Sequence, residues 1–310
     1  MCQDFSTILG YSVKNFLSID FRFVISYNKT EVKILDYLKL ENGILLKDVK
    51  CLDIELSAFC GQAFRWTKTD EGFIKGTVMG KTALIEKIDE GYLFHGTDED
   101  EFKNIWMPYF DLETDYAGIC EKISPDENIK KAVEMYYGIR ILKQEPWEAL
   151  CSFIISQNNN IPRISGIIDR LCRLFGEENE NGEFSFPTYE KISTLTLEDL
   201  APLKAGFRNK YILDAAEKLK NKEIDLQKIY DMPIEEARAE LMKITGVGPK
   251  VAECTLLYGF GRKEAFPVDV WVKRIVSELY PDGLPECIRG NEGIAQQYLF
   301  HWRRNLKDED

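Results

Sequence analysis

Short runs of alternating apolar and polar residues fill the N-terminal third of the chain, between about residues 36 and 110. Alternation with a period of two puts every second side chain on the same face, which is typical of β-strands that bury one face. Gly and Asp separate the runs, as expected for tight turns. We therefore predict an antiparallel β domain over residues 36–115, with strands within LKDVKCLDIEL (46–56), GFIKGTVMG (72–80), TALIEKID (82–89) and GYLFHG (91–96). The first 35 residues fit no pattern and stay unassigned.

From about residue 116 onward, apolar residues recur three and four positions apart, which is the spacing of amphipathic helices. Pro162, Pro233 and Pro249 stand where the first turn of a helix tolerates proline. The predicted fold class is α+β, with a small antiparallel β domain followed by a larger all-α domain over residues 116–310. The clearest helical segments are EPWEALCSFIISQ, PRISGIIDRLCRLFG, KYILDAAEKLK, PIEEARAELMKI, PKVAECTLLYGF and DVWVKRIVSEL.

The composition is that of a globular chain with a sizeable core, because 45% of its 310 residues are apolar and 12% are aromatic. No run approaches the ~20 apolar residues that cross a bilayer. The first 28 residues lack the basic leader of a signal peptide. Eight cysteines form no CxxC pair. We therefore expect a reduced, intracellular and monomeric protein that does not enter a membrane.

The net charge of -12 is spread unevenly. Residues 86–115 hold ten Asp or Glu against two Lys or Arg, and the loop GEENENGEF (176–184) adds four glutamates. We interpret both as solvated surface. Residues 241–310 contain ten basic and ten acidic residues. Because phosphate binding depends on the local face that a protein presents, the acidic total does not exclude a nucleic-acid partner.

The segment TGVGPKVAECTLLYGFGRKEAFPVD (245–269) is the strongest candidate for chemistry. The pattern predicts a helical hairpin at about residues 233–260, with TGVG as its turn. Gly246 and Gly248 would allow positive φ and leave no side chain over the turn. The N–H groups that open the second helix could then bind a phosphate. The alternative is a plain helical corner that ends on glycine, and the two glycines alone do not decide between them.

Together with four other motifs, this hairpin resembles that of the helix-hairpin-helix DNA glycosylases, and among them the 8-oxoguanine DNA glycosylase/lyases. The other motifs are CGQAFRW (60–66), SQNNNIPRISG (156–166), GFRNKY (206–211) and IAQQYLF (294–300), so the resemblance covers roughly residues 40–305. It implies a bifunctional enzyme of base-excision repair, an N-glycosylase with AP lyase activity. Such an enzyme flips 8-oxoguanine from duplex DNA, excises it and nicks the strand by β-elimination.

Lys250 and Asp269 are the catalytic residues that the resemblance implies. Lys250 matches the amine that displaces the base and forms a Schiff base with the sugar. Taken alone, it could equally be an exposed lysine in a first helical turn. Asp269 precedes an apolar helical pattern and would cap that helix, which stabilises it by ~1 kcal/mol. A carboxylate fixed in this way could also stabilise the positive charge that develops at the sugar C1′.

Five further residues match those that hold the lesion base in the family. Gly61 matches a glycine whose carbonyl accepts the N7–H group that 8-oxoguanine has and guanine lacks, and a glycine permits that close approach. Gln296 matches the residue that contacts the Watson–Crick edge. Phe300 and Cys254 match the pair that sandwiches the flipped base. Pro267 completes the predicted base-binding set.

Four residues match those that hold the opened duplex. Asn158 matches the asparagine that fills the gap left by the flipped base, and Arg163 and Arg208 match the pair that contacts the orphaned cytosine. Phe207 takes the place of an aromatic wedge, often tyrosine, that buckles the neighbouring base pair. The expected partner is therefore double-stranded DNA that contains 8-oxoguanine opposite cytosine.

Some features separate the chain from its relatives. Other branches of the superfamily carry four clustered cysteines for an iron–sulfur cluster after the hairpin, but only Cys287 follows Cys254. With two histidines, His95 and His301, and no cofactor motif, we expect neither a metal nor a cofactor. Trp271 replaces a histidine that contacts phosphate in animal members, and we leave it out of the catalytic set.

Two alternatives stay open. One is a related glycosylase that prefers another lesion, such as a ring-opened purine. The other is a non-catalytic module that uses Gly246 and Gly248 only to bind DNA phosphates. For the location we expect a bacterial cytoplasm, at the nucleoid, rather than a nucleus.

Overall fold

The computed structural model describes residues 21–28 and 31–306. Within these ranges, no helix is both long enough and apolar enough to cross a membrane. The predictions made for residues 1–20 lie outside the described residues.

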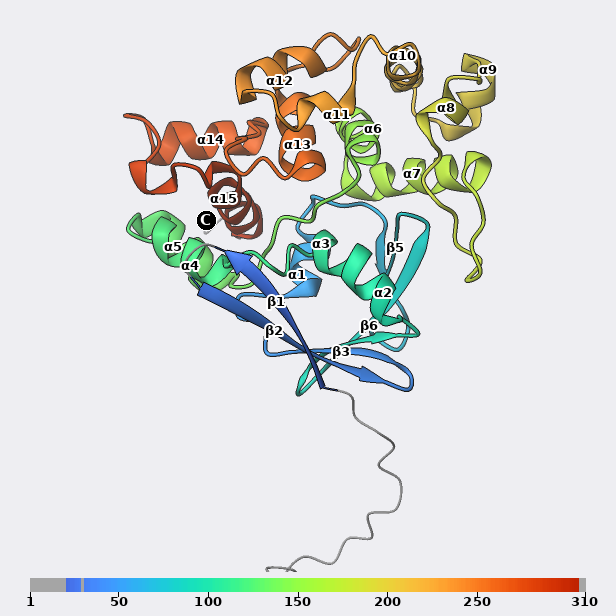
Figure 1. Cartoon of the computed structure of the whole chain (residues 1–310). Helices are drawn as coiled ribbons and strands as arrows, with labels where there is room; N and C mark the ends of the chain where they lie inside the picture. The colour runs from blue at the N-terminus through green and yellow to red at the C-terminus, as the bar shows by residue number, and fades with distance from the viewer. Residues whose placement is uncertain (1–20, 29–30, 307–310) are drawn as a thin grey trace, which may run out of the picture.

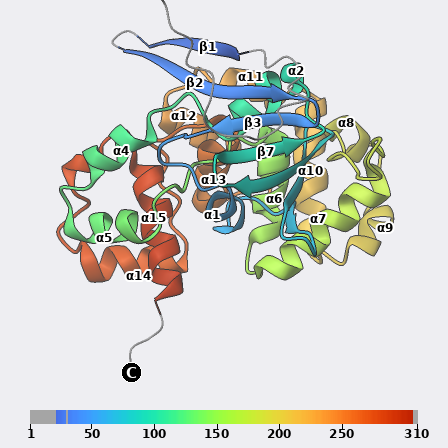
Figure 2. The same cartoon turned by 90° about the horizontal axis from the view of Figure 1, so that it is seen from below.

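A seven-stranded antiparallel sheet occupies the N-terminal part of the described chain, in the order β1-β2-β3-β7-β6-β5-β4. Figure 2, seen from below, shows its strands side by side from β1 to β6. The α+β fold class predicted from the alternating pattern is confirmed. The strands are β1 Phe21–Asn28, β2 Glu31–Leu40, β3 Gly43–Lys47, β4 Trp66–Lys68, β5 Ile74–Val78, β6 Lys81–Ile88 and β7 Gly91–His95.

Two parts of this region differ from the sequence-based expectation. The sheet extends upstream of residue 36, because β1 and the start of β2 lie among residues that fit no pattern. The run LKDVKCLDIEL is not one strand, because it ends β3 and then enters helix α1 (Ile54–Phe59). Asp53 explains the switch, since its side chain accepts a hydrogen bond of 2.9 Å from the Leu56 N–H and caps the helix.

Helices make up most of the chain after residue 98 (Figure 1). Residues 99–109, expected to belong to the β pattern, are helical as well. The helices are α2 Glu99–Glu101, a π-helix Phe102–Trp106, α3 Met107–Tyr109, α4 Tyr116–Ile123, α5 Glu127–Met135, α6 Pro146–Ser156, α7 Ile161–Phe175, α8 Tyr189–Ile192, α9 Leu197–Leu200, a 3₁₀ turn Ala201–Leu203, α10 Arg208–Lys220, α11 Leu226–Ile229, α12 Ile234–Leu241, α13 Pro249–Phe260, α14 Val270–Leu279, a 3₁₀ turn Glu286–Ile288 and α15 Glu292–Asn305.

The core has two main parts that meet where the sheet joins the helices. One face of the sheet packs on α1 and on residues 99–110, with Trp66, Phe94 and Trp106 among its buried members. The other cluster fills the helical part, in which α6 packs closely against α13. Figures 1 and 2 show α4, α5, α14 and α15 as one group of helices and α7, α8 and α9 on the opposite side of α6 and α13.

Arg140 ties the two parts of the core together. Its fully buried guanidinium donates to the carbonyl oxygens of Cys51 at 2.8 Å and Asp111 at 2.6 Å, and the Lys50 carbonyl accepts at 3.0 Å. A buried cation that satisfies three main-chain acceptors fixes their relative positions, because each unpaired carbonyl would cost ~1–3 kcal/mol. Arg140 therefore holds residues 50, 51 and 111 in fixed positions relative to one another.

Candidate active site

The helical hairpin predicted at residues 233–260 is present, with α12 and α13 joined by a turn. Gly246 has a φ of +82°, and an added Cβ would lie 2.3 Å from the Tyr211 ring, so this position requires glycine. Gly248 differs from the expectation, because its φ of -96° is open to any residue. It is the N-cap of α13, and a Cβ there would meet no heavy atom within 4 Å. Pro233 also shifts by one position, since it caps α12 instead of lying in its first turn.

Lys250 lies in the first turn of α13, half-buried. Its ammonium group donates to the Ser156 hydroxyl at 3.2 Å and lies 5.0 Å from the centre of the Phe153 ring. Ser156 in turn donates to the Phe153 carbonyl at 2.8 Å. Lys250 therefore has two polar neighbours, the Ser156 hydroxyl and the Cys254 thiol, and one aromatic partner, and no carboxylate holds it within the described residues.

Asp269 caps α14, as its place in the sequence predicts. Its side chain accepts a hydrogen bond of 2.8 Å from the Val272 N–H. The segment that leads to it is anchored by Glu253, which accepts from the Phe266 N–H at 2.7 Å and pairs with Arg238 of α12. The sequence did not single out this buried glutamate, although it lies in the quoted hairpin segment.

Lys250 and Asp269 face the same cleft, which has a volume of about 860 Å³. The cleft is lined by residues of α13, α14 and α15 and by residues 156–164, together with Gly61, Phe64 and Phe153. A cleft of this size lies in the range of typical ligand sites. The two predicted catalytic residues are thus brought together.

A smaller pocket of about 60 Å³ shares Gly61, Lys250, Asp269 and Phe300 with the lining of that cleft. Its walls contain all five residues predicted to hold the lesion base: Gly61, Cys254, Pro267, Gln296 and Phe300. They come from positions as far apart as 61 and 300, so only the fold unites them.

Gln296 carries an unusual polar atom in this pocket. The side chain is 5% exposed, and its Oε1 atom is buried without a hydrogen-bond partner in the described protein. A buried acceptor left unpaired costs ~1–3 kcal/mol, so it indicates a site for a ligand that donates. Burial raises the pKa of the neighbouring Cys254 thiol to about 11, although the Lys250 charge lowers it, so Cys254 is a neutral wall at pH 7.

Two glutamines that the sequence reasoning missed hold Gly61 in place. Gln62 is fully buried and donates to the carbonyls of Ser57 at 2.9 Å and Arg140 at 2.7 Å. On the other side, Gln297 donates to the Cys60 carbonyl at 3.2 Å. Gly61 itself has a φ of +92°, which only glycine adopts without strain. Both glutamines stand next to predicted site residues in the quoted motifs, which was the available signal.

The three consecutive asparagines between α6 and α7 have different roles. Asn159 donates to the Ile155 carbonyl at 3.0 Å and so closes α6, while Asn160 accepts from the Arg163 N–H at 3.0 Å and caps α7. Asn158 lies between them with a φ of +45°, exposed, and lines the cleft. No described group binds its side chain, so it is free to enter an opened duplex.

Arg163 and Arg208 lie near each other, but their surroundings differ. Arg163 is exposed and makes long hydrogen bonds of 3.3 Å to Asn159 and to the Lys204 carbonyl. Arg208 is only 3% exposed and donates to the carbonyls of Gln157, Asn158 and Ala205. Burial and the Arg163 charge lower the pKa of Arg208. Arg208 is therefore linked to the main chain at Asn158, whereas Arg163 is linked to the neighbouring Asn159 side chain and to the main chain at Lys204.

Phe207 precedes Arg208 at the N-cap of α10, and its ring is 48% exposed. It packs edge-on against Tyr211 with ring centres 5.6 Å apart, and the Arg208 guanidinium lies 4.5 Å from its centre. An exposed ring that is stiffened at its base has the form expected of a wedge.

Comparison with known proteins agrees with this geometry. Residues 44–150 match the model of the 8-oxoguanine DNA glycosylase N-terminal domain, and residues 151–283 match that of the HhH-GPD superfamily of base excision DNA repair proteins. The N-glycosylase/DNA lyase of Saccharomyces cerevisiae is 34% identical over 262 residues, which cover 76% of this chain and 69% of the relative. The probable N-glycosylase/DNA lyase of Methanothermobacter thermautotrophicus is 35% identical over 244 residues, covering 67% and 76%.

The chain belongs to the N-glycosylase/DNA lyase family. A solved structure of the Clostridium acetobutylicum 8-oxoguanine glycosylase/lyase, with double-stranded DNA that contains cytosine opposite 8-oxoguanine, superposes with a TM-score of 0.81 at 37% identity. The match covers 88% of this chain and 98% of the other. The family predicted from five separated motifs is therefore confirmed.

Trp271 is one position where this member of the N-glycosylase/DNA lyase family was expected to depart from its animal relatives. Its ring is exposed, lines the cleft and lies 5.6 Å from the Arg274 guanidinium.

Among the described residues, no three His, Cys, Asp or Glu side chains gather so as to hold a metal ion. The expectation that no metal or cofactor is needed stays a prediction.

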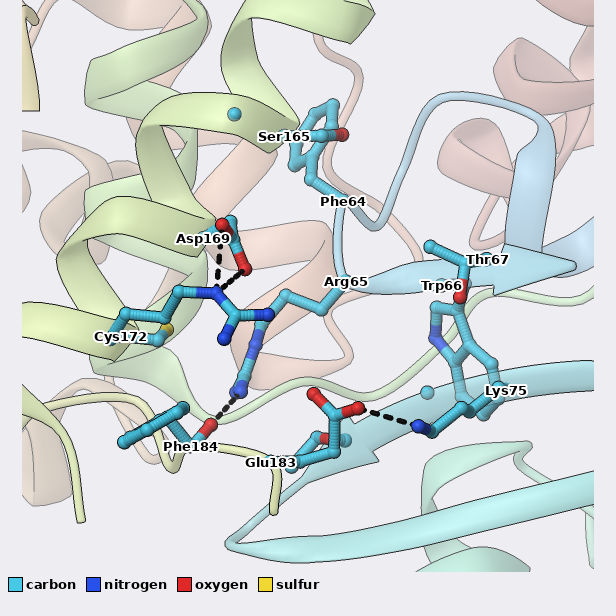
Figure 3. A pocket seen from close by; sticks show the side chains of 14 residues that line it. Phe64, Arg65, Trp66, Thr67, Lys75, Ser165, Asp169, Cys172, Glu183 and Phe184 are labelled. Carbon is cyan, nitrogen blue, oxygen red and sulfur yellow. Dashed lines mark hydrogen bonds and ion pairs between the residues drawn. The ribbon is translucent and has the colours of Figure 1, made fainter. Parts of the chain in front are cut away.

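A second cavity, of about 400 Å³, lies between the sheet and α7, and it shares Phe64 with the cleft. Figure 3 shows that its charges are paired across its walls, with Lys75 bound to Glu183 at 2.5 Å and Arg65 bound to the Phe184 carbonyl. Residues 176–184 are thus not only a solvated acidic loop. Because the charged groups of this cavity already have partners, the cleft with Lys250 remains the site with reactive groups available.

Proposed function

We propose that this N-glycosylase/DNA lyase excises 8-oxoguanine from duplex DNA and nicks the strand, with Lys250 as the nucleophile. The observation that carries the proposal is the buried, unpartnered Gln296 acceptor in a pocket that also contains Gly61 and Lys250. Similarity to the Clostridium acetobutylicum 8-oxoguanine glycosylase/lyase supports the choice of lesion.

The pocket fits the polar edges of the lesion base. Guanine and 8-oxoguanine both present N1–H and N2–H donors on the Watson–Crick edge, and these suit the Gln296 oxygen. They differ at N7, which carries a hydrogen in 8-oxoguanine and a lone pair in guanine. We assign the Gly61 carbonyl as the acceptor for that hydrogen, so that guanine would meet lone-pair repulsion. Phe300 and the neutral Cys254 thiol would contact the two faces of the flipped base.

Lys250 and Asp269 divide the first chemical step between them. The Lys250 ammonium group first loses a proton to solvent, and the neutral amine then attacks C1′ while the bond from C1′ to the base breaks. The electron pair of that bond leaves with the base, which takes up a proton. Positive charge builds on the sugar during this step, and the Asp269 carboxylate stabilises it because α14 already fixes its direction. Lys250 has no carboxylate partner to break before it reacts.

The lyase step follows from the same covalent bond. The amine nitrogen loses a proton, the sugar ring opens and a Schiff base forms between Lys250 and C1′. Removal of a proton from C2′ then expels the 3′-phosphate from C3′, which cuts the strand. Water hydrolyses the Schiff base and frees Lys250. Each electron pair released is taken up by a leaving group, so no redox partner is required.

The remaining residues are proposed to hold the duplex. Asn158 would occupy the gap in the stack, Phe207 would wedge the neighbouring pair, and Arg163 and Arg208 would contact the orphaned cytosine. The turn at Gly246 and Gly248 would bind phosphate. The seven described cysteines are free thiols, which is compatible with the proposed reducing bacterial cytoplasm.

Borohydride trapping on DNA that contains 8-oxoguanine tests the nucleophile. We expect wild type to give a covalent adduct, and Lys250→Gln to bind the same DNA without forming one. Lys243→Gln is the matched control, because Lys243 lies near the same hairpin but pairs with Glu240 at 2.5 Å, and it should be trapped normally. Normal trapping of Lys250→Gln would place the nucleophile elsewhere. Stronger trapping on DNA that contains a ring-opened purine than on DNA that contains 8-oxoguanine would mean that the ring-opened purine is the preferred lesion.

A further inference from the structure

We propose that Arg304 and Lys273 form a phosphate clamp at the mouth of the cleft, which holds the strand whose nucleotide enters the pocket. This inference rests on the proposed function, because it assigns to that site the contact for the sugar–phosphate chain beside the flipped base. Neither residue belongs to the motifs that identified the family.

The charge of the cleft is opposite to that of the whole protein. The chain has a net charge of -12, yet the charged residues that line the cleft are Lys250, Lys273 and Arg304 against the single carboxylate of Asp269. Lys250 and Asp269 are assigned to the chemistry. Lys273 and Arg304 then have no assigned role in the chemistry. Although the protein is acidic, no described carboxylate forms an ion pair with either of them.

Arg304 is exposed near the end of α15, one turn after Phe300. Its guanidinium lies 5.9 Å from the centre of the Phe300 ring, and its Nη1 atom lies 3.5 Å from the point that a Cβ on Gly61 would occupy. It has no ion pair or hydrogen bond with any described side chain. The neighbouring Arg303 differs, because it pairs with Glu278 at 2.8 Å and does not line the cleft.

Lys273 occupies the matching place on α14. It follows Asp269 by one helical turn, so both project from the same side of the helix. It is exposed, and the described carboxylates leave it unpaired. Because α14 and α15 pack against each other (Figure 1), the two cations lie on adjacent helices beside one opening.

Phosphate fits these cations better than a base does. The polar edges of the base are met deeper in the pocket by Gln296 and Gly61, whereas Arg304 and Lys273 stay in solvent at its mouth. When a nucleotide turns into the pocket, its two flanking phosphates remain at that mouth. A guanidinium fork and an ammonium group are the side chains that bind phosphate oxygens in proteins.

The test is the salt dependence of binding to a duplex that contains a stable abasic-site analogue, which needs no catalysis. Each phosphate contact contributes about 0.9 to the slope of log affinity against log salt. We expect Arg304→Gln and Lys273→Gln each to reduce the slope by up to about one and to weaken binding at low salt. Arg303→Gln removes the same charge one position away and should leave the slope unchanged.

Single-turnover excision of 8-oxoguanine at saturating protein separates the clamp from the chemistry. Arg303→Gln, which lies outside the clamp, should keep the wild-type rate, and the two clamp variants should need a higher protein concentration than wild type to reach their maximal rate. An unchanged slope, or an equal loss in Arg303→Gln, overturns the clamp. A normal slope with lost discrimination between 8-oxoguanine and guanine also overturns it, because Arg304 would then contact the base. If wild type fails to excise or to be trapped, the proposed function falls, and the slopes still decide whether these residues bind phosphate.

Discussion

Two parts of the cleft lining differ in how their polar groups are used. We call α13, α14 and α15 the catalytic wall, and residues 156–164 the loop wall. On the catalytic wall, Lys250, Lys273 and Arg304 lack a carboxylate partner among described residues, and Gln296 has an unpaired oxygen. On the loop wall, the side chains of Asn159 and Asn160 bind the main chain, as does nearby Arg208.

This difference indicates which part moves when DNA binds. The catalytic wall can accept a substrate without breaking an ion pair, and Lys250 gives up only its weak contacts to Ser156 and Cys254, so its geometry is largely preorganised. On the loop wall, only Asn158 is uncommitted. For the cytosine contact that we propose, Arg208 would have to exchange main-chain carbonyls for a cytosine edge, and each exchange costs part of the hydrogen-bond energy that it supplies. We infer that opening of the duplex, and not the chemistry, requires local rearrangement of the protein.

The largest expected effect concerns the catalytic wall. Asp269→Asn keeps a side chain that caps α14 but removes the charge that faces C1′. We expect excision to fall by about 10²–10³-fold, as for loss of one stabilising group in a preorganised site, while the melting temperature changes little. Single-turnover kinetics and thermal unfolding measure the two quantities.

Asp126→Asn provides a control for the cap alone. Asp126 caps α5 by accepting from the N–H groups of Asn128 and Ile129, also accepts from the Tyr280 hydroxyl at 2.7 Å, and does not line the cleft. An asparagine keeps the oxygen that accepts these bonds. The excision rate of Asp126→Asn should match that of wild type. Normal excision by Asp269→Asn would mean that Asp269 only caps α14. The proposal that the catalytic wall is preorganised to stabilise positive charge on the sugar would then be wrong.

The next effect concerns the loop wall. Arg208→Ala should lower excision opposite cytosine more than opposite adenine, because a bidentate arginine contact discriminates by roughly 1–3 kcal/mol, or about tenfold to a hundredfold. Excision rates on the two duplexes give the preference directly. Arg208→Lys should retain charge but lose the fork, and so lose most of the discrimination as well.

Equal losses on both duplexes would contradict the cytosine contact. The bonds from Arg208 to Gln157 and Asn158 would then be its whole role, as a support for the loop. Arg163→Ala, at the exposed member of the pair, tests the same point without disturbing buried bonds.

The catalytic wall is also the part that the sequence predicted best. The hairpin glycines and the cap at Asp269 act within a few residues, so local pattern was sufficient to place Lys250 and Asp269 at helix starts. Local pattern could also have found α1, since Asp53 stands three residues before the Leu56 N–H that it caps. Reading LKDVKCLDIEL as a strand overlooked that signal.

Other features depend on contacts that no local pattern contains. Gln62 holds the Gly61 loop through the carbonyl of Arg140, and Gln297 does so from the far end of the chain. Gly248 was expected to allow the positive φ of a tight turn, but as the N-cap of the following helix it has an extended conformation. The direction of the Arg208 side chain is likewise set by a carbonyl 50 residues away in the sequence. The family resemblance, which suggested a cytosine contact for Arg208, could not predict these main-chain partners.

The smallest expected effect uses His301 as a probe of the catalytic wall. Burial, and then the Arg304 charge, hold the pKa of His301 below its ordinary value of 6.5. Its ring packs edge-on against Tyr136 at 4.4 Å, and Asn305 is its polar neighbour at 3.4 Å. The chain has only two histidines, so NMR can follow both during a pH titration.

Arg304→Gln should raise the pKa of His301 toward 6.5, because one of the two causes of its depression is removed. Since the folded state then binds this proton more tightly, the loss of stability as the pH falls below about 6.5 should become smaller. A phosphate that neutralises Arg304 should act in the same direction, so wild type bound to an abasic-analogue duplex should also show a raised His301 pKa. In Arg304→Gln, DNA should add little further change, and Arg303→Gln should respond to DNA as wild type does. If neither DNA nor Arg304→Gln changes the His301 pKa, the Arg304 charge is already screened in the free protein. The contrast between the two walls would then lose its electrostatic basis.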